Sequence, residues 1–160
     1  MGYIVILEVL CYNIRYIPYA RRKTMNCTFF GHKDAPDGLS IKLEQMIFKV
    51  MQENKIEHFY VGNRGSFDYL VQKVLSKMQI DYSIVVSSLN EYVNPNYRSK
   101  TIYPEGLEKG LPRFAICRSN DWMIKNSDIV IAYMKYQSSN CAKWVEKAQK
   151  RGLRIINLAT

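Results

Sequence analysis

Short apolar runs alternate along this chain with longer stretches whose apolar residues recur at helical spacing. The first run, Cys27-Thr28-Phe29-Phe30, stops at a glycine, Gly31. The further apolar runs lie at 59–61, 80–88 (centred on 84–86), 128–133 and 154–158. Between the runs, the helical spacing predicts helices at 40–51, 66–78, 114–125 and 140–150.

Strands without polar alternation are buried on both faces, which is typical of a parallel sheet covered by helices on each side. The sequence therefore predicts an α/β, Rossmann-like fold with three layers (α/β/α) and a mostly parallel sheet of about five strands. The length of 160 residues suits one domain, which we place at 25–160. Residues 89–112 show little periodicity and are predicted to form a long loop that acts as a lid.

Residues 1–24 are set apart as an N-terminal extension. The stretch from Gly2 to Cys11 is apolar, but Glu8 interrupts it, and it is far shorter than the about 20 residues that cross a bilayer. It has neither the basic start nor the cleavage site of a secretory signal. Two interpretations stay open: a packed appendage, or a translation-start artefact in which Met25 is the real start.

The cysteines and histidines argue against a metal site or a disulfide framework. The four cysteines (Cys11, Cys27, Cys117, Cys141) form no C-x-x-C pair, and the only histidines are His32 and His58. We therefore expect no metal and no other cofactor. Free thiols suit the reducing cytoplasm, where we expect the protein to reside, without a membrane partner.

A net charge of +9 favours an anionic partner, although a solvated lysine-rich surface explains it equally well. The chain has no G-x-x-x-x-G-K-[ST] loop, no G-x-G-x-x-G after the first strand and no G-x-S-x-G elbow. Interpretations as a P-loop ATPase, an NAD-dependent dehydrogenase or an α/β-hydrolase therefore lose support.

The strongest candidate site is the turn after the second strand, Gly62-Asn63-Arg64-Gly65. Ligands of such folds bind beyond the carboxyl ends of the strands. Here two glycines allow close backbone approach, the free N–H groups of the next helix favour a phosphate, and Arg64 adds a cation. An ordinary strand-to-helix turn is the alternative explanation.

Three further groups could complete this site. Gly31 and His32 follow the first strand directly, where His32 would contact the ligand. After the fourth strand, Ser138, Ser139 and Asn140 offer hydroxyl and amide groups at a helix start, where they could equally serve only as a cap. Arg118 lies on the helix after the long loop and could face the mouth of that loop. Near that helix's end, Trp122 and Met123 are expected in the core.

Several segments resemble YpsA/YoqJ-type members of the SLOG superfamily. The matching segments are 27–34 (CTFFGHKD), 59–68 (FYVGNRGSFD), 103–108, 113–116, 120–124 and 127–130. The resemblance runs from about residue 27 to residue 158. It implies a Rossmann-like fold of bacterial or phage origin that senses or processes a nucleotide-derived ligand. It also implies kinship with DprA-type DNA-binding proteins and with lysine-decarboxylase-like (LOG) phosphoribohydrolases.

The resemblance carries one catalytic residue over. In the hydrolases, a P-G-G-x-G-T-x-x-E motif binds phosphate and supplies a glutamate, which corresponds here to Glu146. Ser139 and Asn140 replace the first two glycines, Ala142 the third, and Lys143 the threonine. Because the glycines are lost, binding or sensing of a nucleotide-like small molecule, without catalysis, is the leading hypothesis. The alternatives are an N-glycosidic hydrolase that uses Glu146 and DprA-like nucleic-acid binding, and a homo-oligomer is compatible with each.

Overall fold

The chain folds around one sheet of six parallel strands in the order β4-β3-β2-β1-β5-β6, seen in a computed structural model that describes residues 23–97 and 99–160. The strands are β1 (Thr24–Gly31), β2 (Lys55–Val61), β3 (Tyr82–Val85), β4 (Ser99–Ile102), β5 (Ile129–Tyr133) and β6 (Arg154–Asn157). The helices are α1 (Ser40–Glu53), α2 (Ser66–Lys77), α3 (Ala115–Lys125) and α4 (Asn140–Lys150). Short 3-10 turns occupy Asp37–Leu39, Leu107–Lys109 and Pro112–Phe114.

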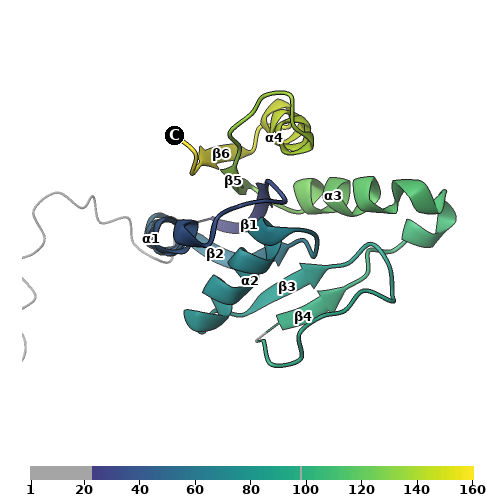
Figure 1. Cartoon of the computed structure of the whole chain (residues 1–160), viewed down its shortest axis with the longest axis horizontal. Coiled ribbons are helices and arrows are strands. Elements are labelled where there is room, and N and C mark those ends of the chain that lie inside the picture. Colours follow the sequence, from purple (N-terminus) through teal and green to yellow (C-terminus); the bar gives the residue numbers. More distant parts are fainter. Residues whose placement is uncertain (1–22, 98) are drawn as a thin grey trace, which may run out of the picture.

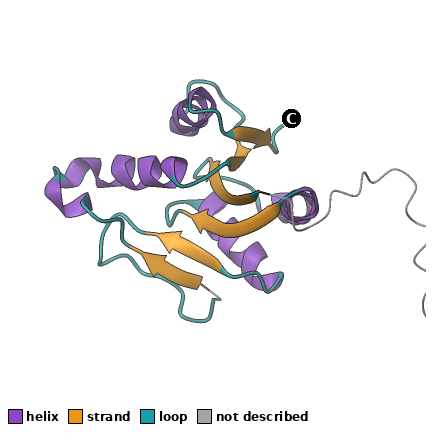
Figure 2. Ribbon diagram, turned by 180° about the vertical axis from the view of Figure 1, so that it is seen from behind, coloured by secondary structure: helices purple, strands orange, loops and turns teal. Residues whose placement is uncertain are grey.

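Helices cover both faces of the sheet, so the predicted three-layer α/β fold is confirmed. On one face α1 and α2 bury Leu43, Ile47, Phe67 and Val71 against strand residues such as Phe29. On the other face α3 and α4 pack Met123, Ile124, Val145 and Ala148 against residues that include Phe30 and Val130. Accordingly, α2 lies in front of the strands in Figure 1 and behind them in Figure 2. Alternate residues of β1 thus serve opposite cores.

The predicted elements from 27 to 158 are present, but the prediction of about five strands missed β4. This strand lies inside 89–112, the segment predicted to be an unbroken loop, and pairs parallel with β3. Its sequence, Ser-Lys-Thr-Ile, has no apolar run, and its side chains are half-buried or exposed. Such a composition is normal at a sheet edge, where one side of the strand faces solvent.

The N-terminal extension lies largely outside the described residues. Residues 1–22 are not among them, whereas β1 already begins at Thr24, one residue before the predicted domain start. Along the part of the chain that the structure describes, no helix is long and apolar enough to cross a membrane.

The strand order reverses between β1 and β5. In open α/β sheets, ligands bind beyond the carboxyl ends of the strands at such a reversal, which here is the end of β1. There Gly31 lies against the first turn of α2: a Cβ on Gly31 would lie 2.2 Å from the ring of Phe67. Phe67 is 1% exposed and is itself part of the core. Any side chain at position 31 must therefore displace a core aromatic ring.

We expect Gly31→Ala to lower the free energy of unfolding by about 1–3 kcal/mol, because overpacking forces the Phe67 ring out of place. Gly38→Ala is the matched control, since a Cβ there meets nothing within 4 Å and the change should stay within about 0.5 kcal/mol. Urea denaturation of both variants measures the difference. Equal stability of the two variants would contradict the packing role of Gly31.

Candidate functional site

A cavity of about 770 Å³ opens at the carboxyl ends of β1, β2 and β3, bounded by α3 and the first half of α4. We call it the strand-end cavity. Its polar lining comprises His32, Lys33, Asn63, Arg64, Asp68, Ser87, Glu91, Arg113, Ser119, Asn120, Asn140, Lys143 and Lys147. Its apolar lining includes Phe29, Phe30, Val85, Ile116, Met123 and Trp144. The predicted residues Gly31 and Gly62 also line it.

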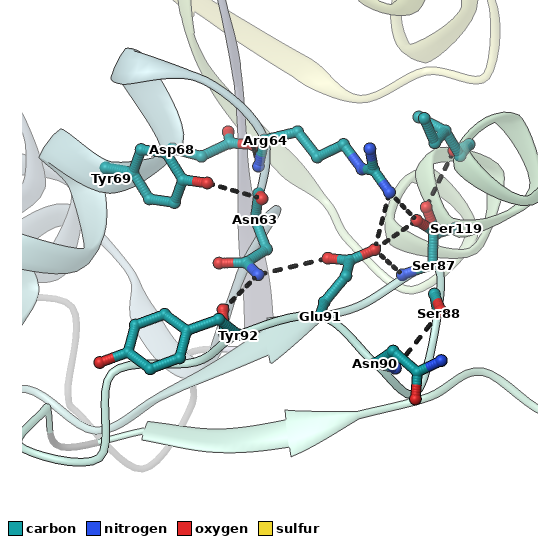
Figure 3. Close-up of polar contacts among 11 residues, drawn as sticks. Asn63, Arg64, Asp68, Tyr69, Ser87, Ser88, Asn90, Glu91, Tyr92 and Ser119 are labelled. Atoms are coloured by element: carbon teal, nitrogen blue, oxygen red, sulfur yellow. Dashed lines mark hydrogen bonds and ion pairs between the residues drawn. The ribbon is translucent and has the colours of Figure 1, made fainter.

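A compact polar network, the Glu91 cluster (Asn63, Arg64, Ser87 and Glu91), forms one side of the cavity (Figure 3). Glu91 Oε1 accepts hydrogen bonds from Arg64 Nη2 (3.1 Å), the Ser87 backbone N–H (2.9 Å) and the Ser87 hydroxyl. Glu91 Oε2 accepts from Asn63 Nδ2 (3.2 Å). Both carboxylate oxygens are therefore satisfied by groups that follow β2 and β3.

Asn63 is fixed from behind by Gln72, a buried residue of α2. Gln72 Nε2 donates to the Gly62 carbonyl (2.9 Å) and to Asn63 Oδ1 (3.1 Å). With its oxygen held in this way, Asn63 turns its NH₂ group toward Glu91 and toward the Tyr92 carbonyl (2.9 Å). The orientation of the Asn63 amide is thus set by Gln72 of α2.

The Glu91 carboxyl is stabilised in its ionised form. Burial alone raises its pKa, but hydrogen bonds from Ser87 and Asn63 and the charge of Arg64 outweigh burial, so the pKa lies below its usual value. The Glu91 side chain is 12% exposed, whereas that of Arg64 is 47% exposed. The Arg64 side chain therefore extends from Glu91 to the open side of the cavity.

Asp68, in the first turn of α2, is a second carboxyl of the cavity, and its pKa is shifted in the opposite direction from that of Glu91. Its Oδ2 accepts the Arg64 backbone N–H at 2.8 Å. Burial raises the pKa of Asp68 to about 7; the Arg64 N–H opposes this, and the charge of Glu91 adds to it. The cavity thus holds one carboxylate fixed as an anion and one carboxyl that titrates near neutral pH.

The predicted turn residue Gly65 and the next residue, Ser66, act through the backbone. Gly65 is the residue before α2 and has φ +99°, and a Cβ there would lie 2.9 Å from Lys33 Cα. Position 65 therefore needs glycine for conformation and for close approach. Ser66 N–H donates to the Lys33 carbonyl (2.9 Å), so the turns after β1 and β2 are joined.

His32 lines the cavity at the reversal of strand order, but one of its ring nitrogens is already engaged. Nε2 accepts the Lys135 backbone N–H at 2.7 Å, and the ring packs against Tyr133 and Tyr136. This contact joins the connection after β1 to the one after β5. The remaining nitrogen, Nδ1, is the atom that a ligand could engage.

Of the three predicted residues at the start of α4, the structure brings one to the cavity. Asn140 lines it, whereas Ser138 is exposed and is not part of the lining. Ser139 caps α4: its hydroxyl accepts the Ala142 N–H (3.1 Å) and donates to the Tyr136 carbonyl (2.7 Å). The hydroxyl of Ser139 is thus committed to the helix start, which was the alternative interpretation.

Arg118 and Glu146 lie outside the cavity lining. The guanidinium of Arg118 donates to the carbonyls of Leu111 (3.1 Å) and Leu107 (2.6 Å), which ties down the segment before α3. Glu146 is exposed on α4 and forms an ion pair with Lys150 at 2.6 Å, which lowers the pKa of its carboxyl. The structure therefore separates both residues from Arg64 and Asn63.

The far wall of the cavity is aromatic and is flanked by cations. Trp144 is half-buried and stacks on Phe30, with ring centroids 6.4 Å apart, while Lys147 Nζ lies 5.5 Å from the indole centroid. Lys147 also pairs with Asp121, which links α4 to α3. The cavity is therefore amphipathic, with a polar side at the strand ends and an aromatic side at α4.

Asp68, Ser87, Glu91 and Trp144 line the cavity but were not predicted as site residues. Asp68 lies in the segment 59–68, four residues after Arg64, and Ser87 directly follows the centre, 84–86, of a predicted strand. The positions of Asp68 and Ser87 in the sequence could therefore have pointed to them as cavity residues. Glu91 lies in a segment without periodicity, so nothing in the sequence pointed to it.

Across residues 23–97 and 99–160, no group of three or more His, Cys, Asp or Glu side chains is arranged to hold a metal ion. Cys27 and Cys141 are buried and Cys117 is exposed, all with free thiols. Burial raises the pKa of the Cys141 thiol to about 12, so this cavity residue is a poor nucleophile at neutral pH.

Comparison with solved structures relates the fold to DNA processing protein A. The DprA structure from Streptococcus pneumoniae superposes with a TM-score of 0.64 and 14% identity, over 84% of this chain and 50% of that one. A Helicobacter pylori DprA structure, described for its single-stranded DNA binding mode, gives 0.52 and 15%, over 83% of this chain and 64% of that one. This chain thus spans about half to two thirds of the DprA chains.

The predicted likeness to DprA-type proteins is confirmed for the fold alone. No family model matches the sequence, and no curated protein matches it. The narrower assignment to YpsA/YoqJ-type proteins and the relation to LOG proteins stay predictions.

The Asp68 carboxyl makes stability depend on pH in a defined direction. Its pKa is about 7 in the folded chain and has its ordinary value, near 4, in the unfolded chain. Between these values only the folded chain holds the proton, so this contribution is greatest at acid pH and is lost as pH rises through about 7. We expect the stability of Asp68→Asn relative to the wild type to increase from pH 5 to pH 8, measured by urea denaturation. A difference that does not change with pH would contradict the shifted pKa.

Proposed function

We propose that the strand-end cavity binds a nucleotide or a nucleotide-derived phosphate ligand. The observation that carries the proposal is the two-sided lining of one cavity, with cations and fixed donors at the strand ends and an aromatic wall at α4. A nucleotide has the same two sides, an anionic phosphate and a flat heterocycle. The volume of about 770 Å³ lies within the range of small-molecule sites.

The charges of the lining favour an anion. Five cationic side chains line the cavity: Lys33, Arg64, Arg113, Lys143 and Lys147. Arg64 and Lys147 have carboxylate partners, whereas in the described part of the chain no ion pair engages Lys33, Arg113 or Lys143. Of the two cavity carboxyls, Glu91 is already neutralised by Arg64 and Asp68 has a pKa of about 7. Unpaired positive charge therefore surrounds the opening.

The aromatic wall favours a planar group. Trp144 is braced from behind by Phe30, so the indole is held in one orientation. Ile116 and Met123 of α3 add apolar surface to the same cavity. A heterocycle placed against this wall would bury apolar area, and aromatic contacts of this kind contribute about 0.5–1.5 kcal/mol beyond that burial.

This arrangement supports binding of the ligand without catalytic turnover. The hydrolase alternative needs Glu146 beside the ligand, yet Glu146 lies on an exposed face of α4 and pairs with Lys150. Among the residues first assigned to phosphate, Arg64 and Asn140 line the cavity, whereas Ser139 and Arg118 are engaged by the backbone. The ligand contacts are therefore assigned to Arg64, Asn63 and Asn140.

Trp144 supplies the readout for a test of nucleotide binding. The chain has two tryptophans, so Trp122→Phe leaves Trp144 as the single reporter. We expect AMP or a related nucleotide to quench its fluorescence, and Arg64→Ala in the same background to weaken binding about tenfold or more. The reason is that hydrogen bonds to a charged group contribute about 1.5–3 kcal/mol.

The control for this test is Arg154→Ala, which removes an equal charge from an ion pair with Glu53 outside the cavity. It should leave the affinity unchanged. The panel comprises nucleoside monophosphates, cyclic nucleotides, NAD and ADP-ribose. If none of them changes the fluorescence or releases heat in calorimetry, the proposal is wrong.

Binding of single-stranded nucleic acid is a second candidate, favoured by the likeness to a DprA structure described for its single-stranded DNA binding mode and by the net charge of +9. In that case the cavity would receive one nucleotide of a strand, and flanking phosphates would meet surface lysines. A single-stranded oligonucleotide should then bind far more tightly than a mononucleotide, with log K falling steeply as log salt rises. Equal affinity and equal salt dependence of the two ligands would exclude this candidate.

A further inference from the structure

Four hydrogen-bond donors converge on the Glu91 carboxylate. Arg64 Nη2, the Ser87 N–H and the Ser87 hydroxyl converge on Oε1, and Asn63 Nδ2 points to Oε2 (Figure 3). A guanidinium, a backbone N–H, a hydroxyl and an amide are the groups with which proteins hold a phosphate. The carboxylate therefore has the surroundings of a bound oxyanion.

Two of the donor residues, Ser87 and Asn63, belong to rigid parts of the fold. Ser87 is 7% exposed and follows β3, where the Val86 N–H is bonded to the Ile102 carbonyl (3.0 Å). Asn63 is 8% exposed and is oriented by Gln72. They would keep their places without Glu91.

The segment that carries Glu91 is held much less firmly. Leu89 and Tyr92 on either side of it are each 77% exposed. The backbone around Glu91 is bound by the Glu91 N–H to the Ser88 carbonyl (3.3 Å), by the Asn90 N–H to the Ser88 hydroxyl (3.3 Å) and by Asn63 Nδ2 to the Tyr92 carbonyl (2.9 Å), and the first two bonds lie within the turn itself. The acceptor thus lies on a surface turn, while its donors lie in the framework.

We infer that the donors of Asn63, Arg64 and Ser87 form an oxyanion subsite of the cavity, selective for a phosphate group, which Glu91 occupies in the unliganded chain. This inference rests on the proposed function and assigns the phosphate end of that ligand. The incoming phosphate replaces the Glu91 carboxylate on the same donors, and the turn at 88–92 moves outward. Glu91 is therefore an internal competitor of the ligand.

The opposite role would make Glu91 an acceptor for the ligand, for example for sugar hydroxyl groups. The two roles predict opposite signs. Removal of a competitor tightens binding, because apparent affinity is reduced by the fraction of chains whose subsite is free. Removal of a ligand acceptor weakens binding.

The test compares Glu91→Gln with the wild type, using inorganic phosphate, ribose 5-phosphate and AMP as probes in titration calorimetry. The amide of this variant is uncharged but keeps an acceptor oxygen for Ser87, so the fold is preserved. We expect all three probes to bind about tenfold more tightly to Glu91→Gln, as for a subsite free in about a tenth of wild-type chains. Glu44→Gln, which removes an exposed carboxylate paired with Lys77, should match the wild type.

A second measurement keeps the test independent of that variant. In the wild type, phosphate should increase amide hydrogen exchange at 88–92 and leave exchange in β3 unchanged. Unchanged or weaker binding by Glu91→Gln, or increased protection at 88–92, would overturn the inference while wild-type AMP binding still supports the proposed function. If neither the wild type nor Glu91→Gln binds AMP, the proposed function itself fails.

Discussion

A parallel sheet with both faces buried forces all of its strands to end at the same edge. In this chain the residues that follow β1, β2 and β3 lie together and line the strand-end cavity. Helices α3 and α4, which cover one face of the sheet, line the same cavity. The backbone polar groups beyond the strand ends then have no ladder partners and must be satisfied by side chains or by a ligand. The polar character of the cavity follows from this requirement.

The way in which the chain meets this requirement explains the unusual density of side-chain bonds at the site. Gln72 reaches from α2 to the Gly62 carbonyl, Asp68 accepts the Arg64 N–H, and Glu91 accepts the Ser87 N–H. Each contact satisfies a backbone group that follows a strand. The same contacts orient Asn63 and Arg64. The hydrogen bonds that satisfy the backbone after the strands therefore also position the side chains of the cavity.

The sequence predicted most of the fold because burial on two sides leaves continuous apolar runs, and helices on each face leave a 3.6-residue period. It failed at β4, whose polar edge sequence carries neither signal. The site was predicted in part, through the turn at Gly62–Gly65, because glycine and a helix start mark it locally. Arg64 and Glu91 are 27 residues apart and lie in the segments that follow β2 and β3, and no local pattern encodes such a pair.

One helical stripe of α4 faces the cavity. Asn140, Lys143, Trp144 and Lys147 have the spacing i, i+3, i+4, i+7 of such a stripe. Glu146 lies beside the stripe, about 60° of helical rotation from Lys143, and its side chain pairs with Lys150 and does not line the cavity. Motif spacing gives the position of this carboxylate along the chain, whereas the direction of its side chain depends on its neighbours on the helix.

The proposed anion site is built before its ligand arrives, and such a site has a cost when it is empty. Buried donors such as the Ser87 N–H and the Asn63 amide would each lose about 1–3 kcal/mol if left without an acceptor. Glu91 removes that cost, because its carboxylate satisfies both donors and neutralises Arg64. A permanent acceptor would block the ligand, so the acceptor has to come from an element that can leave. Its position on an exposed turn, opposite donors fixed in the framework, meets both conditions.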